Sequence, residues 1–218
     1  MATHAPSHVT RARRAQLLRG LYVIVNDSPN ALALAEAALN AGVCVLQYRA
    51  KNGAEAARLA ALRALTQERG ALLILNDDWR IALATNCDGA HLGPGDDGFD
   101  DPRSVRDAAP ELLVGLSCGT AEEVDSATQA GVDYLGIGSV FATVSKRDAG
   151  TPIGIAGLRS LAARTTVSVA AIGGIDATNL AQVRSCGVAM AAVIGAVANS
   201  ANPRRAAEEL VALWSAAP

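Results

Sequence analysis

Lys51 and Lys146 are the only lysines among nineteen lysine and arginine residues in this 218-residue chain. Each lies in a short polar cluster that follows an apolar run. Lysine carries a compact ammonium on a flexible stem, whereas arginine carries a planar fork. We therefore interpret the two lysines as point charges placed for an anionic ligand. A compositional preference for arginine that left two stray lysines is the alternative.

Gln47, Arg49 and Lys51 occupy alternate positions of the segment QYRAK. Because side chains of an extended segment alternate between its faces, all three would face the same side. Two cations and an amide on one side suit a polyanion such as a diphosphate. The alternative is a solvated strand end whose charges pair with nearby acidic residues.

Asp77 and Asp96 each follow a further apolar run. Mg2+ prefers oxygen ligands and rarely receives a full protein cage, so two carboxylates with phosphate oxygens and waters make a typical site. Asp77 could instead cap a helix that begins nearby. Asp96 lies in GPGDDGFDDP, which is also typical of an acidic turn. Their joint position after two neighbouring runs favours a magnesium site.

Glycines follow the last two apolar runs, in the pairs Gly173-Gly174 and Ile194-Gly195. Backbone N–H groups in such loops commonly bind a phosphate group. Tight turns would also explain these glycines. Because two adjacent loops carry them, a phosphate cup is favoured.

The longest irregular segment, SVFATVSKRDAGTPIG, spans residues 139–154 and contains Thr143, Ser145 and Lys146. We interpret it as a mobile lid that brings Lys146 over a bound substrate. His91 is the only histidine beyond the first 20 residues. Its apolar surroundings favour packing, or the orientation of another site residue, over the role of a catalytic base.

These residues must be positioned by eight apolar runs that alternate with alanine-rich stretches. Continuous apolar runs suit strands that are covered on both faces, as in a parallel sheet. The predicted strands span residues 21–25, 43–47, 72–75, 88–92, 112–116, 134–138, 167–172 and 191–196. The predicted helices span residues 29–40, 54–69, 78–84, 102–108, 121–130, 155–163, 177–185 and 203–214.

A repeat of about 24 residues, occurring eight times, indicates the α/β class and a single (β/α)8 TIM barrel. An open doubly wound sheet is the alternative, although it would usually carry fewer strands and no GxGxxG follows the first run. In a barrel, the segments after the strands meet at one rim, where active sites are built. Asn76 and Ser117 also follow predicted strands and join the candidates there.

The first 20 residues contain four arginines and no acidic residue. We predict a basic, poorly ordered extension over residues 1–20 and a catalytic barrel domain over residues 21–218. A targeting segment is the alternative, although this stretch is poor in serine and lacks a clear apolar face.

The net charge of -2 supplies no general attraction to nucleic acid or to an anionic membrane. No apolar stretch approaches the roughly 20 residues that a membrane span needs. The four cysteines form no CxxC pair, so a reduced, cytoplasmic setting is expected. We predict small-molecule partners, without nucleic acid or membrane. A homo-oligomer is compatible with apolar helix faces on a barrel.

The ordered segments QYRAK, LNDD, HLGPGD, GLSCGT, DYLGIGSVFATVSK and AAIGGI resemble the thiamine phosphate synthase family over residues 21–214. The resemblance implies a (β/α)8 transferase of thiamine biosynthesis that uses Mg2+. Such an enzyme joins hydroxymethylpyrimidine diphosphate to hydroxyethylthiazole phosphate and releases pyrophosphate. Both substrates are phosphorylated small molecules, which agrees with the anion sites inferred from the residues.

The resemblance also implies roles for individual residues. Those implied to contact the pyrimidine diphosphate are Gln47, Arg49, Lys51, Asn76, Ser117 and Lys146. Those implied to meet the thiazole phosphate are Thr143, Ser145, Gly174, Ile194 and Gly195. Asp77 and Asp96 would hold Mg2+ on the diphosphate.

The implied mechanism is dissociative: pyrophosphate leaves, a pyrimidine-stabilised carbocation forms, and the thiazole nitrogen captures it. Arg49, Lys51 and Lys146 would stabilise the leaving group by charge, and Ser117 completes the implied catalytic set.

The chain departs from the family pattern at four positions. Ser139 and Ala142 replace usual prolines, which would loosen the lid. Ser145 replaces a usual threonine and keeps its hydroxyl. Gly195 replaces a usual serine and lacks its hydroxyl, which would weaken binding of the thiazole phosphate.

Two other functions compete with synthesis of thiamine phosphate. A thiazole tautomerase branch of the same superfamily shares a GxVF segment, here residues 138–141. Such an enzyme expels no diphosphate and would not need Arg49, both lysines and two metal carboxylates together. A non-catalytic phosphate-ligand-binding barrel is the third candidate. The retained charged set favours the synthase over both.

Overall fold

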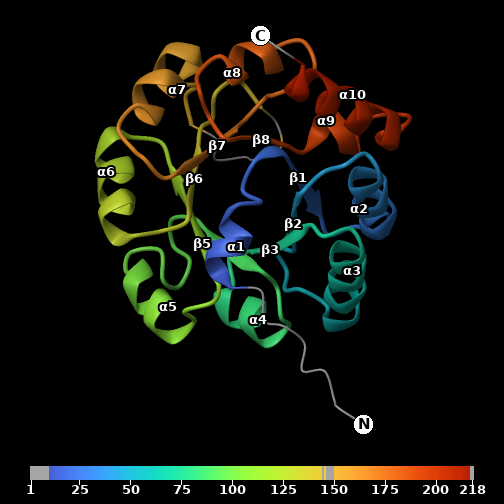
Figure 1. Cartoon of the computed structure of the whole chain (residues 1–218), viewed down its shortest axis with the longest axis horizontal. Helices are drawn as coiled ribbons and strands as arrows, with labels where there is room; N and C mark the ends of the chain where they lie inside the picture. Colours follow the sequence, from blue (N-terminus) through green and yellow to red (C-terminus); the bar gives the residue numbers. More distant parts are fainter. Residues whose placement is uncertain (1–9, 144, 146–149, 217–218) are drawn as a thin grey trace.

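The computed structural model describes residues 10–143, 145 and 150–216. Within these residues, eight parallel strands form a closed barrel surrounded by helices (Figure 1). Each strand pairs with the next, and β8 pairs with β1 to close the ring. The strands are β1 (Gly20–Asn26), β2 (Val45–Arg49), β3 (Leu72–Asn76), β4 (Gly89–Leu92), β5 (Leu113–Cys118), β6 (Tyr134–Ile137), β7 (Ser168–Ile172) and β8 (Met190–Val193). The predicted single (β/α)8 TIM barrel is confirmed.

Most of the helices cover the outside of the barrel, and the bounds of these outer helices agree closely with the alanine-rich stretches of the sequence. They are α1 (Arg11–Ala15), α2 (Ala31–Asn40), α3 (Ala56–Glu68), α4 (Trp79–Ala84), α5 (Pro102–Ala108), α6 (Ala121–Ala130), α7 (Gly154–Ala162), α8 (Leu180–Arg184), α9 (Gly195–Ala198) and α10 (Pro203–Ser215). Helices α1 and α9 were not predicted. The expected last strand ends at Val193, because the chain turns into α9 at Gly195.

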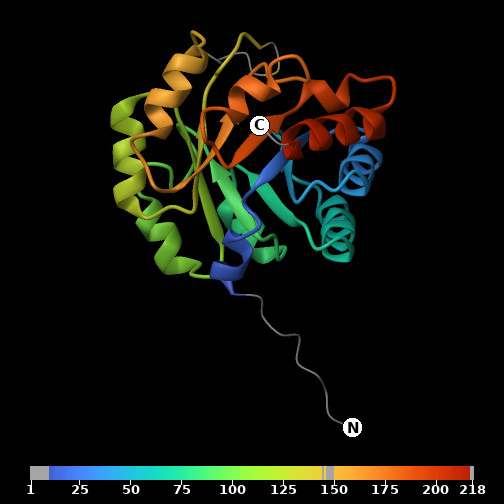
Figure 2. The same ribbon diagram turned by 45° about the horizontal axis from the view of Figure 1, so that its top comes forward.

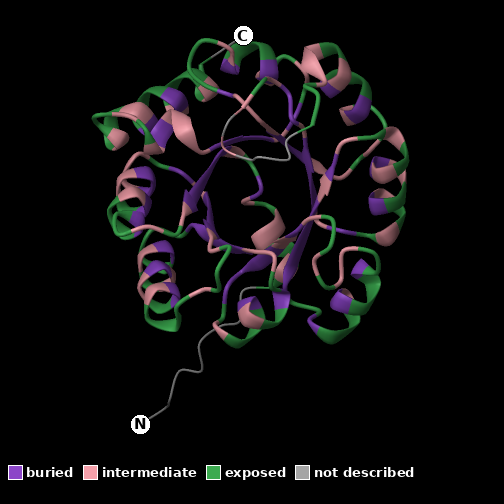
Figure 3. Cartoon of the chain, turned by 180° about the vertical axis from the view of Figure 1, so that it is seen from behind, coloured by how far each residue is buried: buried purple, intermediate pink, exposed green. Residues whose placement is uncertain are grey.

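The strands separate two apolar layers, because alternate residues of a strand point to opposite faces. In β1, Leu21, Val23 and Val25 belong to the layer between the strands and the helices. Tyr22 and Ile24 belong to the layer inside the barrel. The ring of strands is mostly buried, whereas the helices bury mainly the faces turned toward it (Figure 3). Burial on both sides explains why the strands appear as unbroken apolar runs.

The end of the barrel where the strands begin, which we call the lower end, is crossed by α1 (Figure 2). Arg11 and Arg14 of α1 pair with Asp133 and Asp88, at distances of 2.8 and 3.1 Å. Leu18, which follows α1, is buried in the interior layer. Residues 10–19 therefore differ from the poorly ordered extension predicted over 1–20. Their order comes from ion pairs with distant aspartates, which no local pattern reveals.

The two aspartates at the lower end have equivalent surroundings. Asp133 precedes β6, and its carboxylate accepts from the N–H of Val114 and from Arg106, at 2.8 and 2.7 Å. Asp88 precedes β4 and accepts from the N–H of Leu73 and from Arg63, at 2.9 and 2.5 Å. Each carboxylate thus joins a neighbouring strand, a barrel helix and α1. No described helix is both long and apolar enough to cross a membrane.

Candidate active site

A pocket of about 350 Å³ opens at the carboxyl ends of the strands, which we call the rim. It extends into the barrel, where Tyr22, Ile24 and Ala170 form part of its wall. We call it the interior pocket. The predicted site residues that line it are Gln47, Arg49, Lys51, Asn76, Asp77, Asp96, Ser117, Ser145 and Ile194. Residues up to 147 positions apart in the chain therefore surround one cavity. Lys146 lies outside the described residues.

A second rim pocket, of about 880 Å³, adjoins the first and is called the outer pocket. The predicted residues in its wall are Ser117, Thr143, Ser145, Gly174, Ile194 and Gly195. Ser117, Ser145 and Ile194 belong to both walls, so the two cavities meet. The interior pocket carries two cations and two carboxylates. The wall of the outer pocket carries hydroxyls, glycines and apolar side chains, together with the acidic residues Glu123 and Asp176.

The segment QYRAK presents its three polar residues at different depths. Gln47 is only 2% exposed and points into the barrel. Arg49 is partly buried at the end of β2 and donates to Asn26, with a distance of 3.2 Å. Lys51 is more than half exposed beyond the strand. The structure brings all three to the interior pocket, as the alternation indicated.

Asp77 lies directly opposite Lys51. The Lys51 ammonium donates to one oxygen of Asp77 at 2.9 Å, and the amide of Asn76 donates to the other. Asp77 adopts a positive φ of 71°. The residue that caps α4 is Asp78, whose carboxylate accepts from the N–H of Ile81 at 2.9 Å. Helix capping therefore does not explain Asp77.

Asp96 completes the acidic pair. Its carboxylate accepts from the N–H of Gly93 at 2.7 Å. Burial raises the pKa of Asp96 above its usual value, and the neighbouring carboxylate of Asp77 raises it further. A cation held beside the Asp96 carboxylate would favour its charged form.

The donor set suits Mg2+ only in part, as expected for an ion that also binds substrate. The described residues contain no group of three or more His, Cys, Asp or Glu side chains arranged for a metal. Asp77 and Asp96 are two hard oxygen donors, which leaves the remaining positions to waters and phosphate oxygens. The residues therefore fit a magnesium ion that is shared with a diphosphate.

The loop that carries Asp96 is fixed to the helix that follows Asp77. The indole of Trp79 in α4 donates to Asp97 at 2.8 Å. Arg80 pairs with the same carboxylate, and its guanidinium carbon lies 4.3 Å from the centre of the Trp79 ring. These contacts hold the loops after β3 and β4 together, so they limit the separation of the two acidic residues.

The glycines of the predicted phosphate cup also have a packing role. Gly173 and Gly174 have φ values of 105° and 64°. A Cβ at Gly174 would lie 2.4 Å from the carbonyl oxygen of Ala142. The N–H groups of Val140 and Phe141 donate to the carbonyls of Ile172 and Gly173, each at 2.9 Å. Close approach of the 139–143 segment thus requires these glycines, whatever binds beside them.

Sequence reasoning missed Tyr22, which lines the interior pocket, and the fully buried Tyr134, and it left His91 without a definite role. The imidazole of His91 lies between Tyr134 and Ser117, with nitrogen–oxygen distances of 3.1 and 3.0 Å. This agrees with a residue that orients another group. The signal available in the sequence was the presence of polar rings inside otherwise aliphatic strands.

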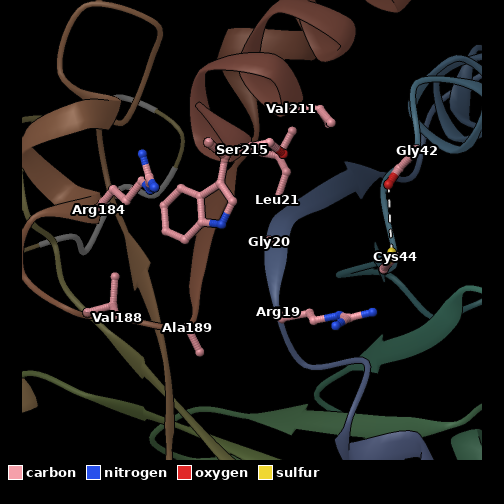
Figure 4. A pocket seen from close by; sticks show the side chains of 11 residues that line it. Arg19, Gly20, Leu21, Gly42, Cys44, Arg184, Val188, Ala189, Val211 and Ser215 are labelled. Atoms are coloured by element: carbon pink, nitrogen blue, oxygen red, sulfur yellow. Dashed lines mark hydrogen bonds between the residues drawn. The ribbon is translucent and has the colours of Figure 1, made fainter. Parts of the chain in front are cut away.

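A separate pocket of about 480 Å³ lies at the lower end, between the start of β1 and helix α10 (Figure 4). Its wall includes Arg19, Arg184 and Val188, and the thiol of Cys44 lies 3.7 Å from the carbonyl of Gly42. It contains none of the predicted site residues. The rim is therefore the candidate active site.

A closed (β/α)8 barrel that gathers charged groups, hydroxyls and glycines at its rim defines the class of TIM-barrel enzymes. Residues 21–197 match a family model described as thiamine monophosphate synthase. The chain belongs to this family.

Similar proteins cover nearly the same residues. The thiamine-phosphate synthase of Herpetosiphon aurantiacus is 43% identical over 200 residues, which are 88% of this chain and 95% of that protein. The thiamine-phosphate synthase of Moorella thermoacetica is 40% identical and covers 87% and 93% of the two chains. The structure of thiamine phosphate pyrophosphorylase from Pyrococcus furiosus is 36% identical, with a TM-score of 0.82 and coverage of 91% and 96%. The chain is therefore a transferase of thiamine biosynthesis.

Proposed function

We propose that this chain joins hydroxymethylpyrimidine diphosphate to hydroxyethylthiazole phosphate where the interior and outer pockets meet. The observation that carries this proposal is the shared wall of the two cavities, which includes Ser117, Ser145 and Ile194. If each pocket held one substrate, the reacting atoms of both substrates would lie in the joint cavity, next to these shared residues. Such positioning removes much of the entropic barrier to a reaction between two molecules.

The pyrimidine diphosphate is proposed to occupy the interior pocket. Gln47 and Ser117 lie at the depth of the ring, while Arg49, Lys51 and Asn76 lie nearer the mouth, where the diphosphate would be. Arginine supplies a fork and lysine a point charge for phosphate oxygens. Lys146, which is outside the described residues, is proposed from the sequence to add a third cation.

Asp77 and Asp96 would hold Mg2+ together with the diphosphate. The bound ion would supply positive charge to the departing pyrophosphate. Lys51 now pairs with Asp77 at 2.9 Å, so it can turn from that carboxylate toward a phosphate group over a short path. The cations of the site would thereby contact the departing pyrophosphate directly, and the carboxylates would contact it through Mg2+.

The thiazole phosphate is proposed to occupy the outer pocket, against the hydroxyls of Thr143 and Ser145 and the backbone of Gly174, Ile194 and Gly195. Ser145 is well placed for this role, since its hydroxyl oxygen would lie 3.9 Å from a Cβ built on Gly195. It faces the position where relatives usually carry a serine hydroxyl.

Bond breaking is proposed to come before bond formation. Pyrophosphate leaves the pyrimidine methylene carbon with the bonding electron pair, and the thiazole nitrogen then donates its own pair to that carbon. No side chain forms a covalent bond in this sequence. The barrier is lowered by charge complementarity around the leaving group and by positioning of the nitrogen.

The test is pyrophosphate release in the presence of both substrates and Mg2+. Release that requires the thiazole phosphate, with thiamine phosphate formed in equal amount, supports the proposal. No release, together with interconversion of thiazole isomers, would identify a tautomerase instead. Binding of both ligands without any conversion would identify a non-catalytic barrel.

We further propose that residues 21–218 form the catalytic domain in a cytoplasmic setting, and that any oligomer is a homo-oligomer. The cytoplasmic proposal is supported by the four cysteines, all of which have free thiols. Leu32, Leu83 and Leu213 are large apolar residues exposed on helices α2, α4 and α10, where a second copy would pack.

A further inference from the structure

A continuous chain of hydrogen bonds crosses the inside of the barrel. The amide nitrogen of Gln47 donates to the Tyr22 hydroxyl at 2.9 Å, which in turn lies 2.9 Å from the Tyr134 hydroxyl. The Tyr134 hydroxyl lies 3.1 Å from Nδ1 of His91, and Nε2 of His91 lies 3.0 Å from the Ser117 hydroxyl. The five residues come from five strands, and the two ends of the chain both face the interior pocket.

The barrel is built around these rings. The rings of Tyr22 and Tyr134 meet edge to face with centres 5.9 Å apart, and His91 stacks on Tyr134 at 5.4 Å. A Cβ at Gly115 would lie 2.1 Å from the Tyr134 ring, and one at Gly136 would lie 2.9 Å from the His91 ring. Both positions must therefore be glycine for the rings to fit.

Either atom of the Tyr22–Tyr134 contact can donate, and the roles of the His91 nitrogens depend on the tautomer, so we infer the direction of the hydrogen-bond chain by accounting for the protons. Gln47 donates to Tyr22, so the single proton of the Tyr22 hydroxyl is left for Tyr134. The Tyr134 proton then goes to Nδ1 of His91, which places the imidazole proton on Nε2. Nε2 donates to Ser117, whose own proton is free to point into the pocket. This arrangement uses every proton of the buried hydroxyls.

We propose that this chain of hydrogen bonds sets the pattern of donors and acceptors offered to the pyrimidine ring in the interior pocket. Gln47 presents its oxygen, an acceptor, and Ser117 presents its hydroxyl proton, a donor. Tyr22, Tyr134 and His91 are positioning residues that hold this pattern without reacting. The inference rests on the proposed placement of the pyrimidine in that pocket.

The pattern matches an aminopyrimidine and opposes its hydrolysed form. An amino group beside a ring nitrogen offers one donor and one acceptor, which complement Gln47 and Ser117. In the corresponding oxo compound, the oxygen accepts and the ring N–H donates, so both contacts become mismatched. A buried site that must leave polar groups unpaired rejects such an analogue by about 10⁴-fold. The enzyme should therefore exclude the oxo-pyrimidine diphosphate.

The first test is the protonation of His91 in the full-length protein. Long-range proton–nitrogen NMR spectra distinguish the two neutral forms of imidazole. His4→Gln and His8→Gln leave His91 as the single histidine. We expect a neutral ring with its proton on Nε2 at about pH 7, and a mixture of forms after Tyr134→Phe. A proton on Nδ1, a charged ring, or an unchanged ring in Tyr134→Phe would each overturn the proposal.

The second test compares matched hydroxyl deletions, since the chain has three tyrosines. Tyr22→Phe and Tyr134→Phe should each raise KM for the pyrimidine diphosphate about tenfold and leave KM for the thiazole phosphate unchanged. Both should also weaken discrimination against the oxo analogue. Tyr48→Phe is the control, because the Tyr48 hydroxyl donates to Asp27 at 2.8 Å, outside the chain. It should change none of these quantities.

Two further variants separate this inference from the function on which it rests. Gln47→Ala and Ser117→Ala should raise KM for the pyrimidine diphosphate if the ring lies between them. If neither variant changes that KM, the proposed placement is wrong and the inference falls with it. If both do so while the two tyrosine variants behave like Tyr48→Phe, the placement stands and the inference alone is wrong.

Discussion

The ammonium of Lys51 lies 2.9 Å from a carboxylate oxygen of Asp77, across the space between the loops that follow β2 and β3. In the proposed reaction these two groups serve one diphosphate, Lys51 by direct contact and Asp77 through Mg2+. Their pairing keeps both at the mouth of the interior pocket before substrate arrives. A substitution at either residue therefore also removes the countercharge of the other residue.

Asp77→Asn should lower turnover by about 10²-fold or more, because it removes a metal ligand and the partner of Lys51 while retaining the side-chain shape. Pyrophosphate release measured over a range of Mg2+ concentrations should also show a higher requirement for Mg2+. Glu208→Gln, which breaks an exposed pair with Arg204 on α10, is the control and should leave turnover unchanged. Normal turnover and Mg2+ dependence in Asp77→Asn would remove its proposed role.

Gly195→Ser should lower KM for the thiazole phosphate about fivefold, because a hydroxyl donor would join that of Ser145. The new Cβ would lie 3.0 Å from the side-chain nitrogen of Asn199, which can shift because it is the end of a flexible side chain. Gly195→Ala adds the same Cβ without the hydroxyl and should not lower KM. Equal values of KM for Gly195→Ser and Gly195→Ala would contradict the proposed contact.

Asp133→Asn should lower the free energy of unfolding by about 3 kcal/mol, since it leaves two arginines without a buried countercharge. The Asp133 side chain is 5% exposed and pairs with Arg11 and Arg106. Denaturant unfolding measures the effect. Asp125→Asn is the matched control, because its pair with Arg164 is exposed and should contribute much less to stability. Similar losses in both variants would count against a special role for the lower-end pairs.

Stability should fall in alkaline solution, partly because of Cys118. Burial raises the pKa of the Cys118 thiol from 9.0 to about 12, and the charge of Glu123 adds to the shift. The unfolded chain loses this proton first, so the contribution to stability is complete below the ordinary thiol pKa and is lost as pH rises toward about 12. Thermal unfolding of Cys118→Ala should show a weaker decline over this interval. A decline as steep as that of the unaltered protein would exclude Cys118 as a cause.

The strands could be predicted because each is buried on both faces, and continuous apolar runs follow directly from that burial. The rim could be predicted because a barrel brings all strand ends together. Depth could not. Gln47 was expected beside Arg49 and Lys51, yet it is buried inside the barrel and bonded to Tyr22, since the position of a strand end relative to the rim depends on the register of the whole ring.

Helix α1 and the polar chain depend on tertiary contacts that leave no local signal. The five residues of α1 have no apolar face, and their order depends on Asp88 and Asp133, which are distant in sequence. Likewise, Tyr134 could be placed in a strand from the sequence, but its contacts with Tyr22 and His91 arise only when the ring closes.

Leu18 belongs to the same buried interior cluster as Tyr22 and Tyr134, so the residues before the first strand help to close the lower end of the barrel. Without these residues, water would enter the interior from the lower end and compete for hydrogen bonds to the tyrosine hydroxyls. A segment outside both rim pockets would thereby keep water from the interior on which the proposed recognition of the pyrimidine depends. Removal of the residues before β1 should therefore lower both the selectivity for the pyrimidine and the stability of the fold.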